Sequence, residues 1–267
     1  MTLTFTILGC GSSAGVPRLG GGWGACDPKN PKNRRRRCSL LVERRNEAGA
    51  RTTVLIDTSP DLREQLLDAD VKSLDGVLVT HAHADHIHGI DDLRSLVLWQ
   101  RRRVDVYMDE RTSALMRRRF GYCFETPPGS SYPPIVNARE MRVGEPVTVN
   151  GPGGPVTALP FVQEHGDVTA LGFRIGPVGY SSDVCNLPSD SLSALQDLEV
   201  WMVDALRYTP HPTHFSVSDA VGWIGRLKPK RAILINMHVD LDYEELRAKL
   251  PPHIEPAYDG MTLEMPG

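Results

Sequence analysis

The sequence predicts an α/β protein in which two β-sheets pack between helical layers. Each half of the chain begins with strand-like segments and ends with helical ones. No linker, repeat or low-complexity segment divides the 267 residues. Layers of this kind bury the apolar face of each sheet against a partner, and a chain of this length can enclose a sizeable core. We therefore expect a single domain over residues 1–267.

The first half alternates short apolar runs with amphipathic segments. Strands are expected at residues 3–8, 38–42, 53–57, 77–80 and 104–108, and helices after Ser59, at 90–99 and at 110–120. Ser59 would cap the first helix and Pro60 would occupy its first position, where a missing N–H has no consequence. Residues 121–134 are rich in proline and aromatic residues, and we expect them to form an irregular cover, because such loops are often lids.

The second half continues with strand pairs and then alternates helices with strands. Strands are expected at residues 147–149, 156–161, 171–175, 178–181, 200–203 and 232–235, and from residue 254 onward, with helices at 192–195, 217–227 and 243–250.

Composition excludes several classes of protein. An apolar content of 40%, a charged content of 24% and a net charge of −3 give no electrostatic case for broad nucleic-acid or membrane binding. No apolar run approaches the roughly 20 residues that span a bilayer, and the N-terminus lacks the features of a signal peptide. Five irregularly spaced cysteines without a Cys-x-x-Cys motif fit free thiols in a reducing compartment, so we expect a cytoplasmic protein.

The most informative stretch is residues 81–86, HAHADH, which follow the apolar run 77–79. A strand that ends here would hold three imidazoles and a carboxylate at one point. Zn²⁺ and similar metals prefer such ligands, and no cysteine lies nearby to form a closed thiolate site. A solvated histidine-rich turn is the alternative. However, His165, Asp183 and His238 follow three other predicted strands, so four strand ends together predict a metal centre.

This pattern resembles the metallo-β-lactamase-fold hydrolases, whose signature is His-x-His-x-Asp-His with a later His, Asp and His. The resemblance covers essentially the whole chain and implies a four-layer αββα sandwich holding two divalent metal ions, Zn²⁺ or Mn²⁺. The ligands it implies are His81, His83 and His165 for one ion, Asp85, His86 and a C-terminal histidine for the other, and Asp183 as the bridge. Asp57 matches a buried carboxylate that supports the motif loop, which is compatible with a simple strand-end cap.

Other segments resemble the branch of this superfamily that cleaves phosphodiesters, in particular the phosphoribosyl 1,2-cyclic phosphate phosphodiesterases of the carbon–phosphorus lyase pathway. These segments are residues 9–17, Arg34 and Arg35 ahead of Cys38, residues 182–188, and residues 258–261. That branch and the tRNA 3′-processing nucleases carry a further histidine before a helix. His214 fits this position, where it would serve the leaving oxygen, and His211, enclosed by two prolines, is the alternative.

Two departures from the family pattern stand out. The phosphonate-pathway enzymes bind a structural zinc through a cysteine cluster, of which only Cys26 remains here, so we expect no such zinc. Ungapped matching also places Asn236 at the last metal-binding position. Either the loop shifts to bring in His238, two residues later, or the second metal is bound more weakly. We favour His238, because Asp240 and Asp242 fit the position less well.

Two segments could bind a substrate phosphate. The glycine-rich loop at residues 9–15, with Ser13, could surround a phosphate with backbone amides, although a tight turn explains it as well and the lysine of a Walker loop is missing. The arginine run at residues 34–37 is typical of a solvated edge, but guanidinium groups also bind phosphate oxygens in pairs. We predict Arg34, Arg35, Ser13 and His214 as substrate-binding residues.

We therefore expect a dinuclear metal-dependent phosphodiesterase that acts on a small cyclic or nucleotide-like phosphorylated substrate, with His214, Asp85 and Asp183 as catalytic residues. We expect no membrane association and no stable nucleic-acid binding. A homodimer is possible. Processing of tRNA 3′ ends is the nearest alternative, but it normally needs an extended basic arm that this sequence lacks. A non-catalytic metal-binding module is the alternative from another class, and it would have little use for Asp183 and His214.

Overall fold

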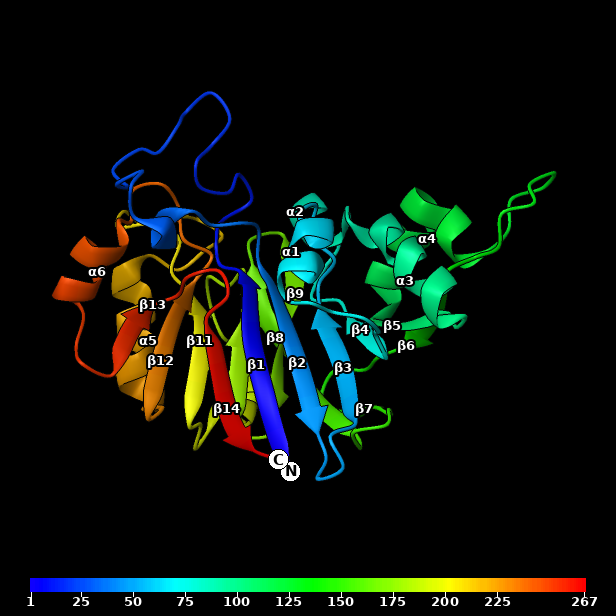
Figure 1. The fold of residues 1–267 in the computed structure, drawn as a ribbon. Coiled ribbons are helices and arrows are strands. Elements are labelled where there is room, and N and C mark those ends of the chain that lie inside the picture. The colour runs from blue at the N-terminus through cyan, green and yellow to red at the C-terminus, as the bar shows by residue number, and fades with distance from the viewer.

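The computed structural model describes residues 1–267 as two seven-stranded sheets that face each other, with helices on their outer faces (Figure 1). The strand order is β14-β1-β2-β3-β4-β5-β6 in the first sheet and β13-β12-β11-β10-β9-β8-β7 in the second. The strands are β1 Thr2–Gly9, β2 Ser39–Arg45, β3 Arg51–Ile56, β4 Gly76–Leu78, β5 Val104–Met108, β6 Val136–Glu140, β7 Val147–Val149, β8 Val156–His165, β9 Val168–Ile175, β10 Val178–Ser181, β11 Val200–Asp204, β12 Arg231–Ile235, β13 Ile254–Pro256 and β14 Thr262–Pro266.

The helices divide between the two outer faces. The α-helices are α1 Leu62–Asp68, α2 Ala84–Ile87, α3 Leu93–Gln100, α4 Glu110–Phe124, α5 Val217–Leu227 and α6 Tyr243–Lys249, and the short 3₁₀ helices are η1 Pro31–Asn33, η2 Ile90–Asp92 and η3 Ser189–Leu195. Helices α1 to α4 lie on the side of the first sheet, whereas α5 and α6 lie on the side of the second (Figure 1). The predicted four-layer αββα architecture is confirmed.

The alternation of side chains along β2 explains why two layers of core form. Leu40 and Val42 point into a 45-residue cluster that fills the space between the sheets and continues to α5 and α6. Leu41, between them, belongs to a second cluster of 21 residues that packs under α1, α3 and α4. Successive side chains of a strand point to opposite faces, so an uninterrupted apolar run is required where both faces are covered.

The strand directions bring chemically active residues to one edge of the molecule. Strands β3 and β4 are parallel, as are β10, β11 and β12. Strand β8 is antiparallel to β9, which is antiparallel to β10, so β8 and β10 run in the same direction. The residues at the ends of these strands, or just after them, therefore meet at the same end of the sandwich, and His165 is itself the last residue of β8.

Some element boundaries differ from the prediction. Helix α1 begins at Leu62 after an N-cap at Asp61, so Ser59 and Pro60 precede it, and the Ser59 hydroxyl instead accepts a hydrogen bond from the Asp61 backbone N–H at 3.1 Å. The predicted terminal strand is two strands in different sheets. Strand β14 pairs with β1, which places the two ends of the chain side by side (Figure 1).

The expected cover at residues 121–134 does not form. Helix α4 continues to Phe124 past a non-helical residue, Phe120, and the loop after it projects away from the body of the molecule (Figure 1). None of these residues lines the cavity described below. None of the helices is both long and apolar enough to cross a membrane.

Candidate metal centre

The HAHADH motif occupies the connection from β4 to α2. His81 lies three residues after the end of β4, and His83 is the N-cap residue of α2. Asp85 and His86 lie in the short helix itself, so the two halves of the motif are presented by different backbone geometries. His81 and His86 are each 1% exposed, which places their imidazoles in the interior rather than on a solvated turn.

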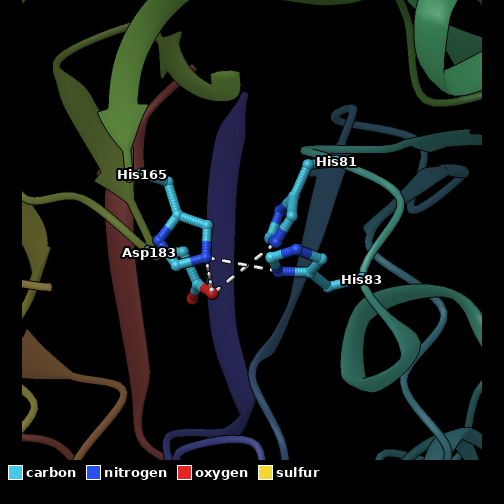
Figure 2. A group of neighbouring side chains, drawn as sticks. All are labelled: His81, His83, His165 and Asp183. Carbon is cyan, nitrogen blue, oxygen red and sulfur yellow. Dashed lines mark hydrogen bonds and ion pairs between the residues drawn. The ribbon is translucent and has the colours of Figure 1, made fainter. Parts of the chain in front are cut away.

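The structure brings His81, His83, His165 and Asp183 together (Figure 2). Each offers one ligand atom, and these atoms lie within 4.8 Å of one another. Oδ2 of Asp183 is 3.5 Å from Nε2 of His165 and 3.6 Å from Nε2 of His81. Nε2 of His165 lies 3.2 Å from Nδ1 of His83. We call these four residues the three-histidine group.

Asp85 and His86 form a second group that shares Asp183 with the first. Oδ1 of Asp183 lies 3.3 Å from Nε2 of His86, and Oδ2 of Asp85 lies 3.4 Å from the same nitrogen. Asp183 follows β10 with a positive φ of 54°, a conformation that aspartate tolerates better than most residues. Oδ2 of Asp183 faces His81 and His165, whereas Oδ1 faces His86. We call Asp85, His86 and Asp183 the carboxylate-rich group.

The donor atoms of the three-histidine group fit a divalent metal ion. Nε2 of His81 is buried and has no hydrogen-bond partner, an arrangement that costs about 1–3 kcal/mol unless something binds that atom. Burial lowers the pKa of His81 well below its usual range and lowers the pKa of His83 and His165 as well. The imidazoles are thus held neutral, which is the form that binds metals.

Asp57 holds the motif loop through hydrogen bonds to Thr80 and His86. It follows β3 with a φ of 64°, and its Oδ2 accepts hydrogen bonds from Nδ1 of His86 at 2.7 Å and from the Thr80 hydroxyl at 2.8 Å. Its Oδ1 accepts one from the Thr80 backbone N–H at 2.8 Å. Although burial opposes it, the carboxylates of Asp183, Asp85 and Asp57 raise the pKa of His86. Asp57 therefore fixes the ring orientation of a candidate ligand, as the sequence resemblance implied.

His214 lies beside the two groups and is held by Asp204 at the end of β11. Its Nδ1 donates to Oδ2 of Asp204 at 2.8 Å, and its ring centroid lies 4.6 Å from that of His165. Although burial opposes it, the Asp204 carboxylate raises the pKa of His214. Burial in turn raises the pKa of Asp204 to about 6. With Nδ1 engaged, Nε2 is the nitrogen left to act in the cavity.

The groups open into a cavity of about 340 Å³. Its lining includes four residues of the ligand groups together with His214: His83, Asp85, His165 and Asp183. Arg18, Arg207, Ser12 and Ser13 line the same cavity. Acidic ligand residues and basic residues thus face the same space, which suits an anionic group that bridges them.

Comparison with known proteins places this architecture in a family. Residues 52–237 match the family model of the beta-lactamase superfamily domain. The chain belongs to the beta-lactamase superfamily. A solved diphosphatase from the PhnP family is similar to it at 34% identity with a TM-score of 0.88, covering 99% of this chain and 98% of that one.

More distant solved structures share the fold alone. Zn²⁺-bound PqqB from Methylobacterium extorquens superposes with a TM-score of 0.72 at 15% identity, over 97% of this chain and 99% of that one. The short form of human tRNase Z gives a TM-score of 0.62 at 16% identity, over 98% of this chain and 99% of that one.

A curated relative extends beyond the region that the chain matches. The octanoyltransferase of Porphyromonas gingivalis (strain ATCC BAA-308 / W83) is 35% identical over 260 residues. The match covers 96% of this chain, and the chain spans 50% of the length of that relative.

His238 does not join the ligands as this superfamily's pattern led us to expect. Its Nε2 lies 2.9 Å from a guanidinium nitrogen of Arg18, and its Nδ1 contacts Asp240. Asn236 instead directs its amide at Asp183, with Nδ2 2.9 Å from Oδ1. The backbone turns at Asn236 with a φ of 61°, so this residue faces the carboxylates and the loop does not shift to bring in its neighbour.

Arg34 and Arg35 do not reach the cavity, contrary to the prediction. Arg34 is exposed and lies in a separate surface depression near Asp259. Arg35 is 1% exposed, and its guanidinium donates to the backbone oxygens of Leu241 at 2.7 Å and His238 at 3.3 Å. It ties the loop after β1 to the loop after β12, a structural role. Ser13 does line the cavity.

Sequence reasoning missed Asp204, Arg18 and Arg207. Asp204 ends the apolar run 200–203 just as Asp57 ends 53–56, so the strand-end signal that found the ligands could have found it. Arg18 and Arg207 lie in loops without periodicity, and nothing local marks them.

Proposed function

We propose that this chain is a dinuclear metal-dependent phosphodiesterase that acts on a small cyclic or nucleotide-like phosphorylated substrate. The observation that carries the proposal is the position of Asp183, which lines the cavity and offers one oxygen to each of the two ligand groups. The similarity to a diphosphatase of the PhnP family over nearly the whole of both chains supports the choice of phosphorus chemistry.

The ligand groups would hold two divalent ions, Zn²⁺ or Mn²⁺, one in the three-histidine group and one in the carboxylate-rich group. Such ions lower the pKa of water and neutralise charge on a phosphoryl oxygen. The residues of the chain provide the positions for this chemistry. Asp183 fixes the relation between the two groups, while Asp57 and Thr213 orient His86 and His165 through hydrogen bonds to their Nδ1 atoms at 2.7 Å each.

His214 would deliver a proton to the leaving oxygen. Its Nδ1 is held by the buried carboxylate of Asp204, so the ring is fixed with Nε2 as the acidic nitrogen. The same carboxylate favours the protonated imidazole electrostatically, which is the form required at the start of bond cleavage. Asp85 is the third catalytic residue predicted from the sequence. It lines the cavity, and its side chain is 17% exposed.

Arg18 and Arg207 would bind the phosphate of the substrate. Both line the cavity, and guanidinium groups donate hydrogen bonds to phosphate oxygens. Nε and Nη2 of Arg207 already donate to the backbone oxygens of Thr209 and Pro210, which leaves Nη1 for the phosphate. Ser12 and Ser13 line the same region. The cavity volume of about 340 Å³ is at the small end of ligand sites and fits a compact phosphorylated molecule.

The test is an assay of metal-free protein reloaded with Zn²⁺ or Mn²⁺. Substrates are bis(p-nitrophenyl) phosphate, ribose cyclic phosphates and a precursor tRNA. We expect hydrolysis of the small diesters and none of the tRNA. Selective cleavage of the tRNA would support a 3′-processing nuclease instead, and metal binding without any hydrolysis would support a non-catalytic module.

A further inference from the structure

The two ligand groups of the proposed metal centre are chemically unequal. We propose that the three-histidine group binds one Zn²⁺ tightly, whereas the carboxylate-rich group binds its ion weakly and prefers a harder cation such as Mn²⁺. The difference arises from Asn236, which stands where a fourth imidazole would complete the second position. This inference rests on the proposed function and specifies how its metal centre is filled.

The donor atoms determine the preference. The three-histidine group offers three imidazole nitrogens and one carboxylate oxygen, a combination typical of zinc. The carboxylate-rich group offers one imidazole and two carboxylates, and Asn236 can add only a neutral amide oxygen. Imidazole suits Zn²⁺, while carboxylate and carbonyl oxygens suit Mn²⁺ and Mg²⁺.

Asn236 also competes for the Asp183 oxygen that belongs to the carboxylate-rich group. Its Nδ2 donates to Oδ1 of Asp183 at 2.9 Å, and this oxygen is the one that faces His86. An ion in the carboxylate-rich group must either share Oδ1 with that hydrogen bond or turn the amide. Turning it would place the NH₂ group against Sγ of Cys38, which lies 3.9 Å from the present amide oxygen and is a weak acceptor. Either route reduces the affinity.

Neighbouring side chains do not compensate. Both ring nitrogens of His238 are engaged, by Arg18 and by Asp240. Each group has one partly exposed residue, His83 in the three-histidine group and Asp85 in the carboxylate-rich group. Exposure therefore does not distinguish the two groups, and the difference rests on their donor atoms.

The experiment measures metal bound per chain without reference to activity. Metal-free protein is equilibrated by dialysis against increasing Zn²⁺ or Mn²⁺, and bound metal is determined by elemental analysis, with electron paramagnetic resonance for Mn²⁺. We expect one tight Zn²⁺ and a second equivalent that requires a concentration on the order of 100-fold higher. Protein carrying one Zn²⁺ should then take up one Mn²⁺.

Two variants locate the cause. Asn236→His should bring the second Zn²⁺ to within about tenfold of the first, because it supplies the missing imidazole. Asn236→Asp supplies an anionic oxygen and should strengthen Mn²⁺ more than Zn²⁺. Asn137→His is the matched control. Asn137, on β6, also donates its amide to a carboxylate, Asp105, at 2.8 Å, but it is absent from both ligand groups.

Two equally tight Zn²⁺ ions in the parent protein, unchanged in Asn236→His, would overturn the inference and leave the proposed function standing. A parent protein that binds no divalent ion at all would overturn the metal centre and the proposed function together. Equal effects of Asn236→His and Asn137→His would also contradict the inference, because only one of these positions faces Asp183.

Discussion

Asp204 holds His214 through a 2.8 Å hydrogen bond between Oδ2 and Nδ1. The same carboxylate oxygen accepts a hydrogen bond from the backbone N–H of Val184 at 3.0 Å, one residue after Asp183. One buried carboxylate therefore fixes both the proposed proton donor and the loop that carries the shared ligand. The two parts of the site are positioned by a single side chain at the end of β11.

Removing the imidazole of His214 should slow the reaction without emptying the metal centre. For His214→Gln we expect kcat on a small diester to fall by about 10²–10⁴-fold, because general acid catalysis is lost. Bound metal per chain should stay at the parent value. His211→Gln is the control, since the His211 ring lies 5.1 Å from that of His214 but contacts Thr213 rather than Asp204. A larger loss in His211→Gln would reverse the two assignments.

Asp204→Asn separates orientation from charge. The amide can still accept from His214, but it no longer favours the imidazolium, so the pKa of His214 should fall. We expect a loss of activity of roughly 10–100-fold that grows as pH rises, because less of the donor is protonated. Rate–pH profiles of parent and variant check this, and an unchanged profile would show that Asp204 acts only by packing.

Asp57→Asn should weaken metal binding, although Asp57 belongs to neither ligand group. Nδ1 of His86 and two Thr80 donors converge on this carboxylate, so its loss frees a ligand ring. We expect metal affinity to fall by about 10–100-fold. Equilibrium dialysis measures it, and Asp105→Asn, which removes the remote partner of Asn137, is the matched control. Identical affinities in the two variants would contradict the role given to Asp57.

Arginine substitutions should separate cavity residues from structural ones. Arg18→Ala should raise KM for a phosphorylated substrate, because the guanidinium lines the cavity. Arg34→Ala should change neither KM nor stability, since this side chain is exposed. Arg35→Ala should lower the free energy of unfolding by about 2–4 kcal/mol, because the buried backbone oxygens of Leu241 and His238 lose their donor. Kinetics and urea unfolding of all three variants check the contrast.

The fold and most candidate ligands could be predicted because both rest on local patterns. Apolar runs mark the strands, and His81, His165 and Asp183 each follow one. The arginine run illustrates the limit. Arg35 pairs with Val16 in an isolated β-bridge and points inward while Arg34 points outward, and four identical residues in a row carry no signal of that alternation.

The prediction that His238 is the last metal ligand was wrong for a related reason. The side chain that faces the carboxylates is set by the left-handed turn at Asn236, a backbone property that a list of residue types does not reveal. His238 has the better chemistry for a metal, but the turn directs it to Arg18. The cover predicted at residues 121–134 was inferred from the length of the segment and its proline and aromatic residues, and neither fixes the direction in which a loop projects.

Asp259 should make the stability of the protein depend on pH in a defined window. Burial raises the pKa of its carboxyl to about 6, even though Arg36 donates to Oδ2 from its backbone N at 2.8 Å and from Nε at 3.1 Å. In the unfolded chain an aspartate titrates near pH 3.9. The folded state therefore binds the proton more tightly, so this contribution to stability is full below about pH 4 and is lost as pH rises through about 6.

The variant Asp259→Asn is neutral throughout, so its stability relative to the parent should rise by up to about 3 kcal/mol between pH 4 and pH 7. Urea unfolding of the metal-free proteins at several pH values measures this difference. Asp68→Asn is the matched control, because it removes the 67% exposed partner of the same Arg36 side chain. If the parent instead gained stability relative to Asp259→Asn as pH rose, the hydrogen bonds from Arg36 would outweigh burial, and the ionised carboxylate would stabilise the link between the loop after β1 and the C-terminal segment.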